Sequence, residues 1–557
     1  MPVMTGSRYF AEFMKGYGVS HVFFIPAVLT RALAEMDRIG VRGIMTHGEK
    51  AAAYMADGYA RASRRPGICL AQTVGAANLA AGLRDAYLAR SPVIAITGGR
   101  RSETKHRHVY QEIEDFELFA PVTKFNAQVD IVERLPDLLR QAFREVTSGS
   151  PAPVHLEITG NMGQGIDGEA DLDLIVEERY TSAPAFRPRA EDDRVQSALR
   201  HLTSAQRPLI VAGGGVTASG AQGEVVELAE RLSIPVATAL NAKGSIPECH
   251  PLSIGVVGLY SRVCANRVAS AADLIFYIGS HTGSQVTNDW KVPPTSTAAI
   301  QLDIDPSELG RNYPNVESLC GDAKAVLRQM IDAIESDREP GAWCDEVRAT
   351  VDAWRQEVSP LCRSDAAPLR PERICKELQA FLPSDAIVLA ETGHSGMWAG
   401  MYLDINQPHQ TFLRAAGSLG WGLPAALGAK CAHPERPVIC FSGDGGLYYH
   451  LSELETAARH GINAVILVNN NHSLNMETEL FADAYGGTQS SGFEMWKFRE
   501  LNLAKVAESL GCLGIRVEKP SELQPALEEA LASGRPALVD VDSDIEALAP
   551  AAWAPEK

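Results

Sequence analysis

Short runs of β-branched and other apolar residues alternate with longer helical patterns along nearly the whole chain, and this alternation constrains the fold more than any other feature. Residues 67–72, 208–212 and 437–441 are examples of the apolar runs, and residues 49–62 and 223–232 have helical spacing. The alternation is typical of parallel sheets whose faces are covered by helices. We therefore predict an α/β protein with doubly wound parallel sheets.

The alternation divides into three blocks of similar size, which we place at residues 1–180, 190–335 and 366–545. A polar segment rich in proline and arginine separates the first two blocks, and a charged stretch followed by a connecting helix separates the last two. The length of 557 residues favours three or four domains. We expect three α/β domains, one for each block.

Charge and composition exclude several classes of partner. The 51 Lys and Arg residues against 69 Asp and Glu residues give a net charge of −18, which repels nucleic acid and anionic membranes. No stretch approaches the roughly 18 apolar residues of a membrane span, and Arg8, Glu12 and Lys15 interrupt the place where a signal peptide needs an apolar core. The ten cysteines form no C-x-x-C pair. We expect a cytoplasmic protein that binds neither nucleic acid nor membrane.

A glycine-rich acidic turn and an asparagine triplet follow two of the predicted strands. Asp444 lies in the turn 443–446, and Asn471 ends the triplet 27 residues later, about the length of one strand–helix–strand crossover. A carboxylate, an amide oxygen and a backbone carbonyl suit Mg²⁺ and leave room for phosphate oxygens and water. The glycines allow backbone N–H groups to approach a diphosphate. These residues predict a magnesium–diphosphate site at the carboxyl edge of a sheet.

The combination of this turn with Asn471 resembles the signature of thiamine-diphosphate-dependent enzymes, in particular the acetolactate-synthase-like group. The chain is also similar to 2-hydroxyacyl-CoA lyases and oxalyl-CoA decarboxylase. The resemblance implies that Asp444, Asn471 and the backbone oxygen of Ser473 hold Mg²⁺. It also implies a pyrimidine-binding first domain, a Rossmann-like central domain and a diphosphate-binding third domain, with thiamine diphosphate as the cofactor.

Residues 46–61 resemble the family's segment around the acid that activates the cofactor, which implies this role for Glu49. A carboxyl group in an apolar setting can share a proton with the pyrimidine ring, because burial raises its pKa. In the resemblance, the carbonyl of Gly417 accepts a hydrogen bond from the pyrimidine amine, and Leu419 is the apolar wedge that bends the cofactor. The other implied cofactor contacts are Asn78, Thr392, Gly393, His394, Ser395, Gly443, Gly445 and Gly446, together with Asp444, Asn471 and Ser473.

The reaction is less specified than the cofactor. Residues 108–115 resemble a segment whose glutamine, here Gln111, faces the reacting centre. Glu494 lies where some 2-hydroxyacyl-CoA lyases have a proton-exchanging glutamate, although an exposed charge on an amphipathic helix explains it equally well. We expect a carboligase that acts on a 2-oxo acid such as pyruvate. The alternatives are a 2-hydroxyacyl-CoA lyase, which cleaves its substrate to formyl-CoA and a ketone or aldehyde, a related 2-oxo acid or acyl-CoA decarboxylase, and a catalytically silent regulatory homologue.

The resemblance also bears on the central block and on assembly. The central domain binds FAD in acetolactate synthase and an adenine nucleotide or CoA in relatives that act on acyl-CoA, so residues 213–215, Asp303 and Asp305 could line a nucleotide site. The loop 280–288 lacks the arginine usual there, which disfavours a flavin. Glu49 and the metal turn lie in different blocks, and in this family they meet across a subunit interface. A homodimer is therefore implied, and two such dimers are implied to form a homotetramer.

Overall fold

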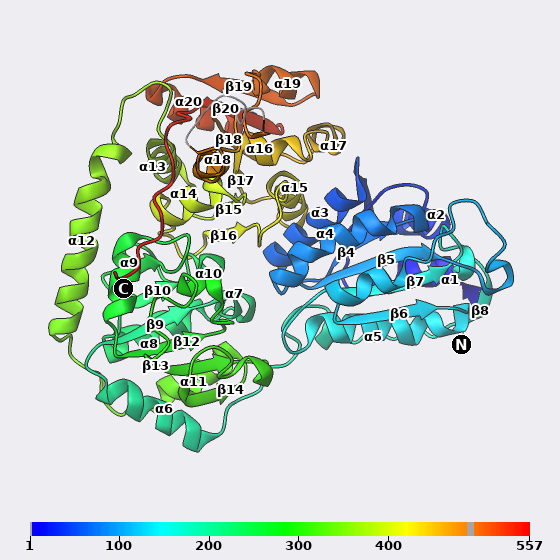
Figure 1. Cartoon of the computed structure of the whole chain (residues 1–557). Helices are drawn as coiled ribbons and strands as arrows, with labels where there is room; N and C mark the ends of the chain where they lie inside the picture. The colour runs from blue at the N-terminus through cyan, green and yellow to red at the C-terminus, as the bar shows by residue number, and fades with distance from the viewer. Residues whose placement is uncertain (1–2, 487–494, 557) are drawn as a thin grey trace.

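The computed structural model describes residues 3–486 and 495–556, and it has three lobes (Figure 1). The first lobe is blue to cyan in Figure 1, the second is green, and the third runs from yellow to red. Each lobe is built on a six-stranded sheet in which every neighbouring pair of strands is parallel. The predicted α/β class with parallel sheets covered by helices is therefore confirmed.

The first lobe contains a sheet with the strand order β3-β2-β4-β5-β7-β6. The strands are β2 (His21–Phe24), β3 (Arg42–Met45), β4 (Gly67–Ala71), β5 (Val93–Gly99), β6 (Phe125–Val129) and β7 (Val154–Thr159). The helices are α1 (Gly6–Gly16), α2 (Thr30–Arg38), α3 (Glu49–Ser63), α4 (Ala76–Leu88) and α5 (Leu135–Thr147). A short antiparallel pair, β1 (Val3–Thr5) and β8 (Glu169–Asp171), joins the two ends of the lobe.

The second lobe contains a sheet with the order β11-β10-β9-β12-β13-β14. The strands are β9 (Pro208–Ala212), β10 (Val236–Thr238), β11 (Ser253–Val256), β12 (Leu274–Ile278), β13 (Ala298–Asp303) and β14 (Asn315–Cys320). The helices are α6 (Asp192–Ser204), α7 (Gly214–Ser219), α8 (Gln222–Leu232), α9 (Val263–Ala271), α10 (Ser284–Thr287) and α11 (Ala323–Asp332). Counted within the lobe, the order is 3-2-1-4-5-6, so the chain reverses direction across the sheet between β9 and β12, where such sheets bind ligands.

The third lobe contains a sheet with the order β16-β15-β17-β18-β20-β19. The strands are β15 (Ile387–Ala390), β16 (Thr411–Arg414), β17 (Val438–Gly443), β18 (Val465–Asn470), β19 (Leu513–Val517) and β20 (Ala537–Asp542). The helices are α13 (Pro371–Phe381), α14 (His394–Tyr402), α15 (Gly422–Ala432), α16 (Asp444–Tyr448), α17 (Glu453–His460), α18 (Thr478–Ala484), α19 (Leu503–Ser509) and α20 (Pro520–Ala532). Counted within each lobe, the first and third sheets have the same order, 2-1-3-4-6-5.

Helices α3 and α15 pack against each other and join the first lobe to the third (Figure 1). Their apolar residues belong to one buried cluster that includes side chains of both sheets. A Cβ atom at Gly58 would lie 2.6 Å from the carbonyl carbon of Ala425, and a Cβ atom at Gly428 would lie 2.7 Å from that of Met55. Since carbon atoms in contact are normally about 3.5–4.0 Å apart, only glycine allows the two backbones to approach this closely.

Two further segments tie the second lobe to the third. The 21-residue helix α12 (Ala342–Cys362) runs along one side of both lobes (Figure 1). The chain then returns from β20 to the second lobe, where the carbonyl of Trp553 accepts hydrogen bonds from the amides of Asn266 at 2.9 Å and Asn288 at 3.3 Å. Within residues 3–486 and 495–556, no helix is both long and apolar enough to span a bilayer.

Candidate active site

A pocket of about 220 Å³ lies at the carboxyl ends of β15, β17 and β18. In the third sheet the strand order reverses between β15 and β17, which is the place where open α/β sheets bind ligands. All cofactor contacts predicted in the third block line this one pocket: Thr392, Gly393, His394, Ser395, Gly417, Leu419, Gly443, Asp444, Gly445, Gly446, Asn471 and Ser473. The structure therefore brings together residues that are up to 81 positions apart in the sequence.

Asp444 lies at the first turn of α16, at the end of β17, and only 1% of it is exposed. Its Oδ2 atom has no hydrogen-bond partner among the described residues. Burial raises the pKa of this carboxyl to about 7 in the absence of a positive charge. A buried carboxylate oxygen without a partner is costly unless a ligand satisfies it, so Asp444 fits a bound cation.

The side chains of the asparagine triplet, at the end of β18 and in the turn that follows, point in different directions. Asn469 and Asn471 line the pocket, whereas the amide of Asn470 points away and donates to Asp540 Oδ1 at 2.8 Å. Asn471 Oδ1 accepts from the hydroxyl of Ser473 at 2.9 Å. Asn469 is 3% exposed, and within the part of the chain that the structure describes its Oδ1 has no hydrogen-bond partner. The triplet signalled this residue in the sequence, but the spacing argument selected only Asn471.

The predicted diphosphate loop connects β15 to α14. Gly393 has a φ of +68°, a conformation that favours glycine, and a Cβ atom added there would meet only the sulfur of Met476, at 3.9 Å. His394 begins α14, and its Nδ1 donates to Asn475 Oδ1 at 2.7 Å. Burial lowers the pKa of His394, so its ring is held neutral with Nδ1 protonated. The loop thus offers backbone N–H groups at a helix N-terminus, the arrangement that binds phosphate oxygens.

The backbone of the loop 416–422, which carries the predicted pyrimidine contacts, is hydrogen-bonded by three side chains that the sequence did not reveal. Asp85 of α4 accepts hydrogen bonds from the backbone N–H groups of residues 416–418. Glu391 Oε2 accepts from Gly422 N at 2.9 Å, and burial raises the pKa of this carboxyl to about 7. His450 Nδ1 donates to the carbonyl of Gly420 at 2.8 Å. The loop's shape is therefore fixed by polar side chains on both of its sides.

Glu49 and Asn78 lie together but outside this pocket. Glu49 is the first residue of α3, and its Oε2 accepts from the amide of Asn78 on α4 at 3.2 Å. Both side chains are accessible to solvent. Within the described residues, the pocket lining comes from the third lobe and from Tyr260 of the second, and it includes nothing from the first. The predicted activating acid and the predicted metal site are therefore separate within one chain.

The two residues predicted to face the substrate are not part of the pocket either. Gln111 is half-buried in a loop of the first lobe with a φ of +60°, and it does not line the pocket. Glu494 lies outside the described residues. Its role and that of Gln111 remain predictions.

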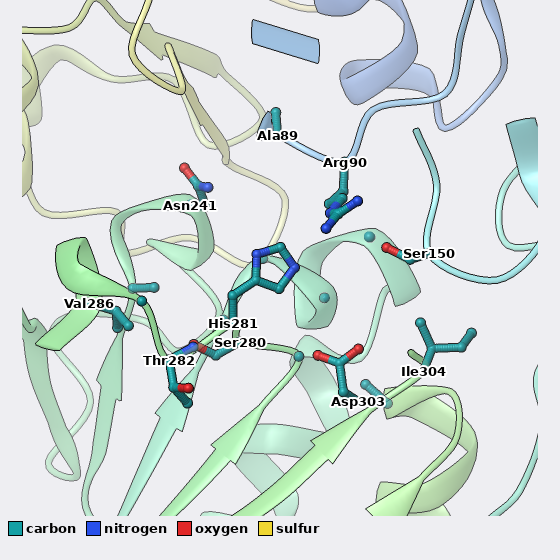
Figure 2. Close-up of a pocket in the computed structure, with 18 of the residues that line it drawn as sticks. Ala89, Arg90, Ser150, Asn241, Ser280, His281, Thr282, Val286, Asp303 and Ile304 are labelled. Carbon is teal, nitrogen blue, oxygen red and sulfur yellow. The ribbon is translucent and has the colours of Figure 1, made fainter. Parts of the chain in front are cut away.

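A second and larger pocket, of about 330 Å³, lies at the carboxyl ends of β9, β12 and β13 (Figure 2). Residues 213–215 and Asp303 line it, as the sequence predicted for a nucleotide site, whereas Asp305 does not. Asp303 is 7% exposed, and burial raises its pKa. In Figure 2, His281 lies between Asn241 and Arg90. Arg90 and Ser150 belong to the first lobe, which therefore closes one side of this pocket.

Three family models match the chain. They describe the thiamine pyrophosphate enzyme N-terminal TPP binding domain over residues 4–118, the central domain over 195–330, and the C-terminal TPP binding domain over 391–541. The probable acetolactate synthase large subunit of Methanocaldococcus jannaschii is 33% identical over 97% of this chain and 92% of its own length. The corresponding protein of Methanococcus aeolicus is 34% identical over 90% and 85%. The acetolactate synthase isozyme 1 large subunit of Escherichia coli is 29% identical over 97% and 94%.

Proposed function

The chain belongs to the thiamine pyrophosphate enzyme family, and we propose that it is an acetolactate-synthase-like carboligase that uses thiamine diphosphate and Mg²⁺ to act on a 2-oxo acid such as pyruvate. One observation carries the proposal: the pocket at the edge of the third sheet combines an unsatisfied buried carboxylate with a phosphate-binding loop. The similar proteins named as acetolactate synthase large subunits, which match over nearly their whole length, support the choice of reaction.

In this proposal the third lobe holds the charged end of the cofactor. Asp444, Asn471 and the backbone oxygen of Ser473 would bind Mg²⁺, and the loop 392–395 would bind the diphosphate through backbone N–H groups. Gly417 and Leu419 would hold the pyrimidine ring. When bound, thiamine diphosphate supplies a carbon nucleophile that attacks the substrate carbonyl and then stabilises negative charge.

Glu49 would supply the proton that the pyrimidine needs. Because Glu49 is outside the pocket of its own chain, solvent-accessible and bonded to Asn78, we propose that it completes the pocket of a second copy. Glu49 would then share a proton with the pyrimidine nitrogen N1′ of the partner's cofactor. This arrangement requires a homodimer, and a homotetramer made of two such dimers is the proposed assembly. The ten cysteines are free and mostly buried, which suits the proposed cytoplasmic location.

The central pocket is the candidate site for a second ligand. It lies where the strand order of the second sheet reverses, and it combines residues 213–215 with the buried carboxylate of Asp303. Such an edge suits the phosphates and ribose of an adenine nucleotide. We propose an ADP or CoA moiety here in preference to FAD, because the loop 280–288 lacks the expected arginine.

Product analysis separates the proposed reaction from its alternatives. With pyruvate, Mg²⁺ and thiamine diphosphate, mass spectrometry should detect acetolactate. Formation of a 2-hydroxyacyl-CoA from formyl-CoA and acetone, without acetolactate from pyruvate, would favour the lyase instead. Release of only carbon dioxide and an aldehyde would indicate a decarboxylase, and the absence of any turnover with cofactor bound would indicate a silent homologue.

Two variants test the roles of the site residues. Asp444→Ala should abolish Mg²⁺-dependent binding of thiamine diphosphate in calorimetry, whereas Asp365→Ala, a control whose side chain is 89% exposed, should bind normally. Glu49→Gln should bind the cofactor and lose at least about 100-fold in turnover, the range of a general acid–base contribution. Undiminished binding by Asp444→Ala, or near-normal turnover by Glu49→Gln, would contradict the assignment.

A further inference from the structure

Three consecutive backbone N–H groups in the loop 416–422 converge on one side chain of another lobe. Ala416 N donates to Asp85 Oδ2 at 2.9 Å, and the N–H groups of Gly417 and Ser418 donate to Oδ1 at 3.1 and 2.9 Å. Asp85 is fully buried on α4. The contact joins positions more than 330 residues apart in the same chain.

A carboxylate is suited to this place because both of its oxygens accept and it donates nothing. Successive N–H groups that point to one spot form a concave patch of positive potential, which an anion satisfies. Replacing Asp85 by an apolar residue would leave three N–H groups without their acceptor in a partly buried setting, and such groups either recruit water or move. The local conformation of residues 416–418 therefore depends on Asp85.

The same loop shapes the cofactor pocket. Gly417 and Leu419 line the pocket directly. Of the loop's other polar partners, Glu391 and His450 belong to the third lobe, and Asp57 of the first lobe accepts from the indole N–H of Trp421 at 2.7 Å. Asp85 is the side chain of the first lobe that accepts from the backbone of residues 416–418, and it lies seven residues after Asn78 on α4. Helix α4 thus bears a buried residue that reaches the loop of its own chain and an exposed residue bonded to Glu49.

We infer that Asp85 is a positioning residue that sets the pyrimidine-binding loop of its own chain, while Glu49 and Asn78 of the same lobe serve the cofactor pocket of a second copy. This inference rests on the proposed function. It assigns each first lobe to two cofactor pockets: its own, through Asp85, and its partner's, through Glu49.

Cofactor binding gives the first test. In calorimetry with Mg²⁺, Asp85→Ala should weaken binding of thiamine diphosphate at least about tenfold, the effect expected when hydrogen bonds to a charged group are lost. Asp85→Asn keeps one acceptor oxygen and the same shape, so its affinity should lie between those of Asp85→Ala and the wild type. Asp365→Ala is the exposed control and should bind as the wild type does. Wild-type affinity in Asp85→Asn and Asp85→Ala would overturn the inference, and Asp85→Asn alone decides if Asp85→Ala does not fold.

Mixed assemblies give the second test, which a merely structural role would not pass. Glu49→Gln and Asp85→Ala chains are co-expressed with different tags and assayed at a thiamine diphosphate concentration near the wild-type Kd, where each variant alone has little activity. In a mixed dimer, the Glu49→Gln lobe and the Asp85→Ala loop fall in the same pocket, which leaves the other pocket intact. Random pairing into two-fold dimers should therefore restore about a quarter of the wild-type activity.

The outcomes of the second test are distinct. Recovery of activity supports the inference. Absence of recovery, with mixed dimers verified by tandem purification, means that both residues serve one chain's pocket or that both serve the partner's, and it overturns the inference. Failure of the proposed function is recognised separately, because the wild-type protein would then not bind thiamine diphosphate or Glu49→Gln would keep its activity.

Discussion

Replacing Gly58 by alanine tests the contact between the first and third lobes. The new Cβ atom would lie 2.6 Å from the carbonyl carbon of Ala425, about 1 Å inside normal carbon–carbon contact. The obstacle is the backbone of α15, so relief requires the two helices to separate instead of a side chain turning aside. Overpacking of this kind typically lowers the free energy of unfolding by about 1–3 kcal/mol, and because the obstacle here is backbone we expect a cost of about 3 kcal/mol for Gly58→Ala.

An opposing effect reduces this cost. Alanine is a better helix former than glycine by about 1 kcal/mol, so we expect a net loss of about 2 kcal/mol in the free energy of unfolding. For domains of this size that corresponds to a decrease in Tm of roughly 4–8 °C. Differential scanning calorimetry of the purified protein measures the shift.

Gly223→Ala is the matched control for this experiment. Gly223 lies in α8, and a Cβ atom added there would meet nothing within 4 Å in the described part of the chain. The same substitution should therefore raise stability by about 0.4–1 kcal/mol. If Gly58→Ala melts no lower than Gly223→Ala, the close approach of the two helices does not determine stability, and the reasoning fails.

Three other predictions follow from buried polar groups. Burial lowers the pKa of His155 to about 3, so the unfolded state takes up a proton first and the free energy of unfolding falls as the pH decreases from about 6.5. In urea titrations, His155→Gln should remove about 2 kcal/mol of the stability lost between pH 7 and pH 5. An unchanged loss in this variant would contradict the account. Asn469→Leu removes a buried amide oxygen, Oδ1, that has no hydrogen-bond partner among the described residues, so it should weaken Mg²⁺-dependent binding of thiamine diphosphate about tenfold in calorimetry without lowering Tm. Unaltered affinity would show that this oxygen does not contact the cofactor. The buried ammonium group of Lys243 donates hydrogen bonds to both carboxylate oxygens of Glu248. Lys243→Met leaves the Glu248 charge without this partner and should lower the free energy of unfolding in urea by about 3–5 kcal/mol, whereas Lys243→Met/Glu248→Gln should lower it by less. Equal losses in the two variants would mean that the buried charge is not the cause.

The elements that could be predicted from sequence are those whose signal is local. Apolar run 437–441 became β17 (Val438–Gly443), and the helical pattern 49–62 became α3 (Glu49–Ser63), because burial imposes the periods of strand and helix on the sequence itself. The resemblance to thiamine-diphosphate-dependent enzymes is confirmed as membership of that family. Among the residues that line the pocket of the third lobe, those in the turns after β17 and β18 were predictable from their place directly after strands, and the others were implied by the resemblance.

The residues that sequence reasoning missed act through distant contacts. In the sequence, Asp85 is indistinguishable from an ordinary charged residue of a helix. Its hydrogen bonds to the backbone of residues 416–418 are seen only in the folded structure, where α4 meets that loop. The choice between Asn469, Asn470 and Asn471 depended on which way each side chain leaves β18. The contact of Asn470 with Asp540 removes Asn470, and both Asn469 and Asn471 line the pocket. The pocket that Glu49 would complete depends on a second copy, which the pattern within one sequence does not position.

The crossing of α3 and α15 is reciprocal. Gly58 meets the residue three positions before Gly428, and Gly428 meets the residue three positions before Gly58. Each helix follows the edge strand at the same place in a sheet of the same order, so the crossing has an approximate local two-fold symmetry that relates the turn leading to Glu49 to the turn carrying Gly417. A change in the crossing angle would displace both turns together, so one polypeptide has internally an approximation of the symmetry that identical subunits ordinarily create between them.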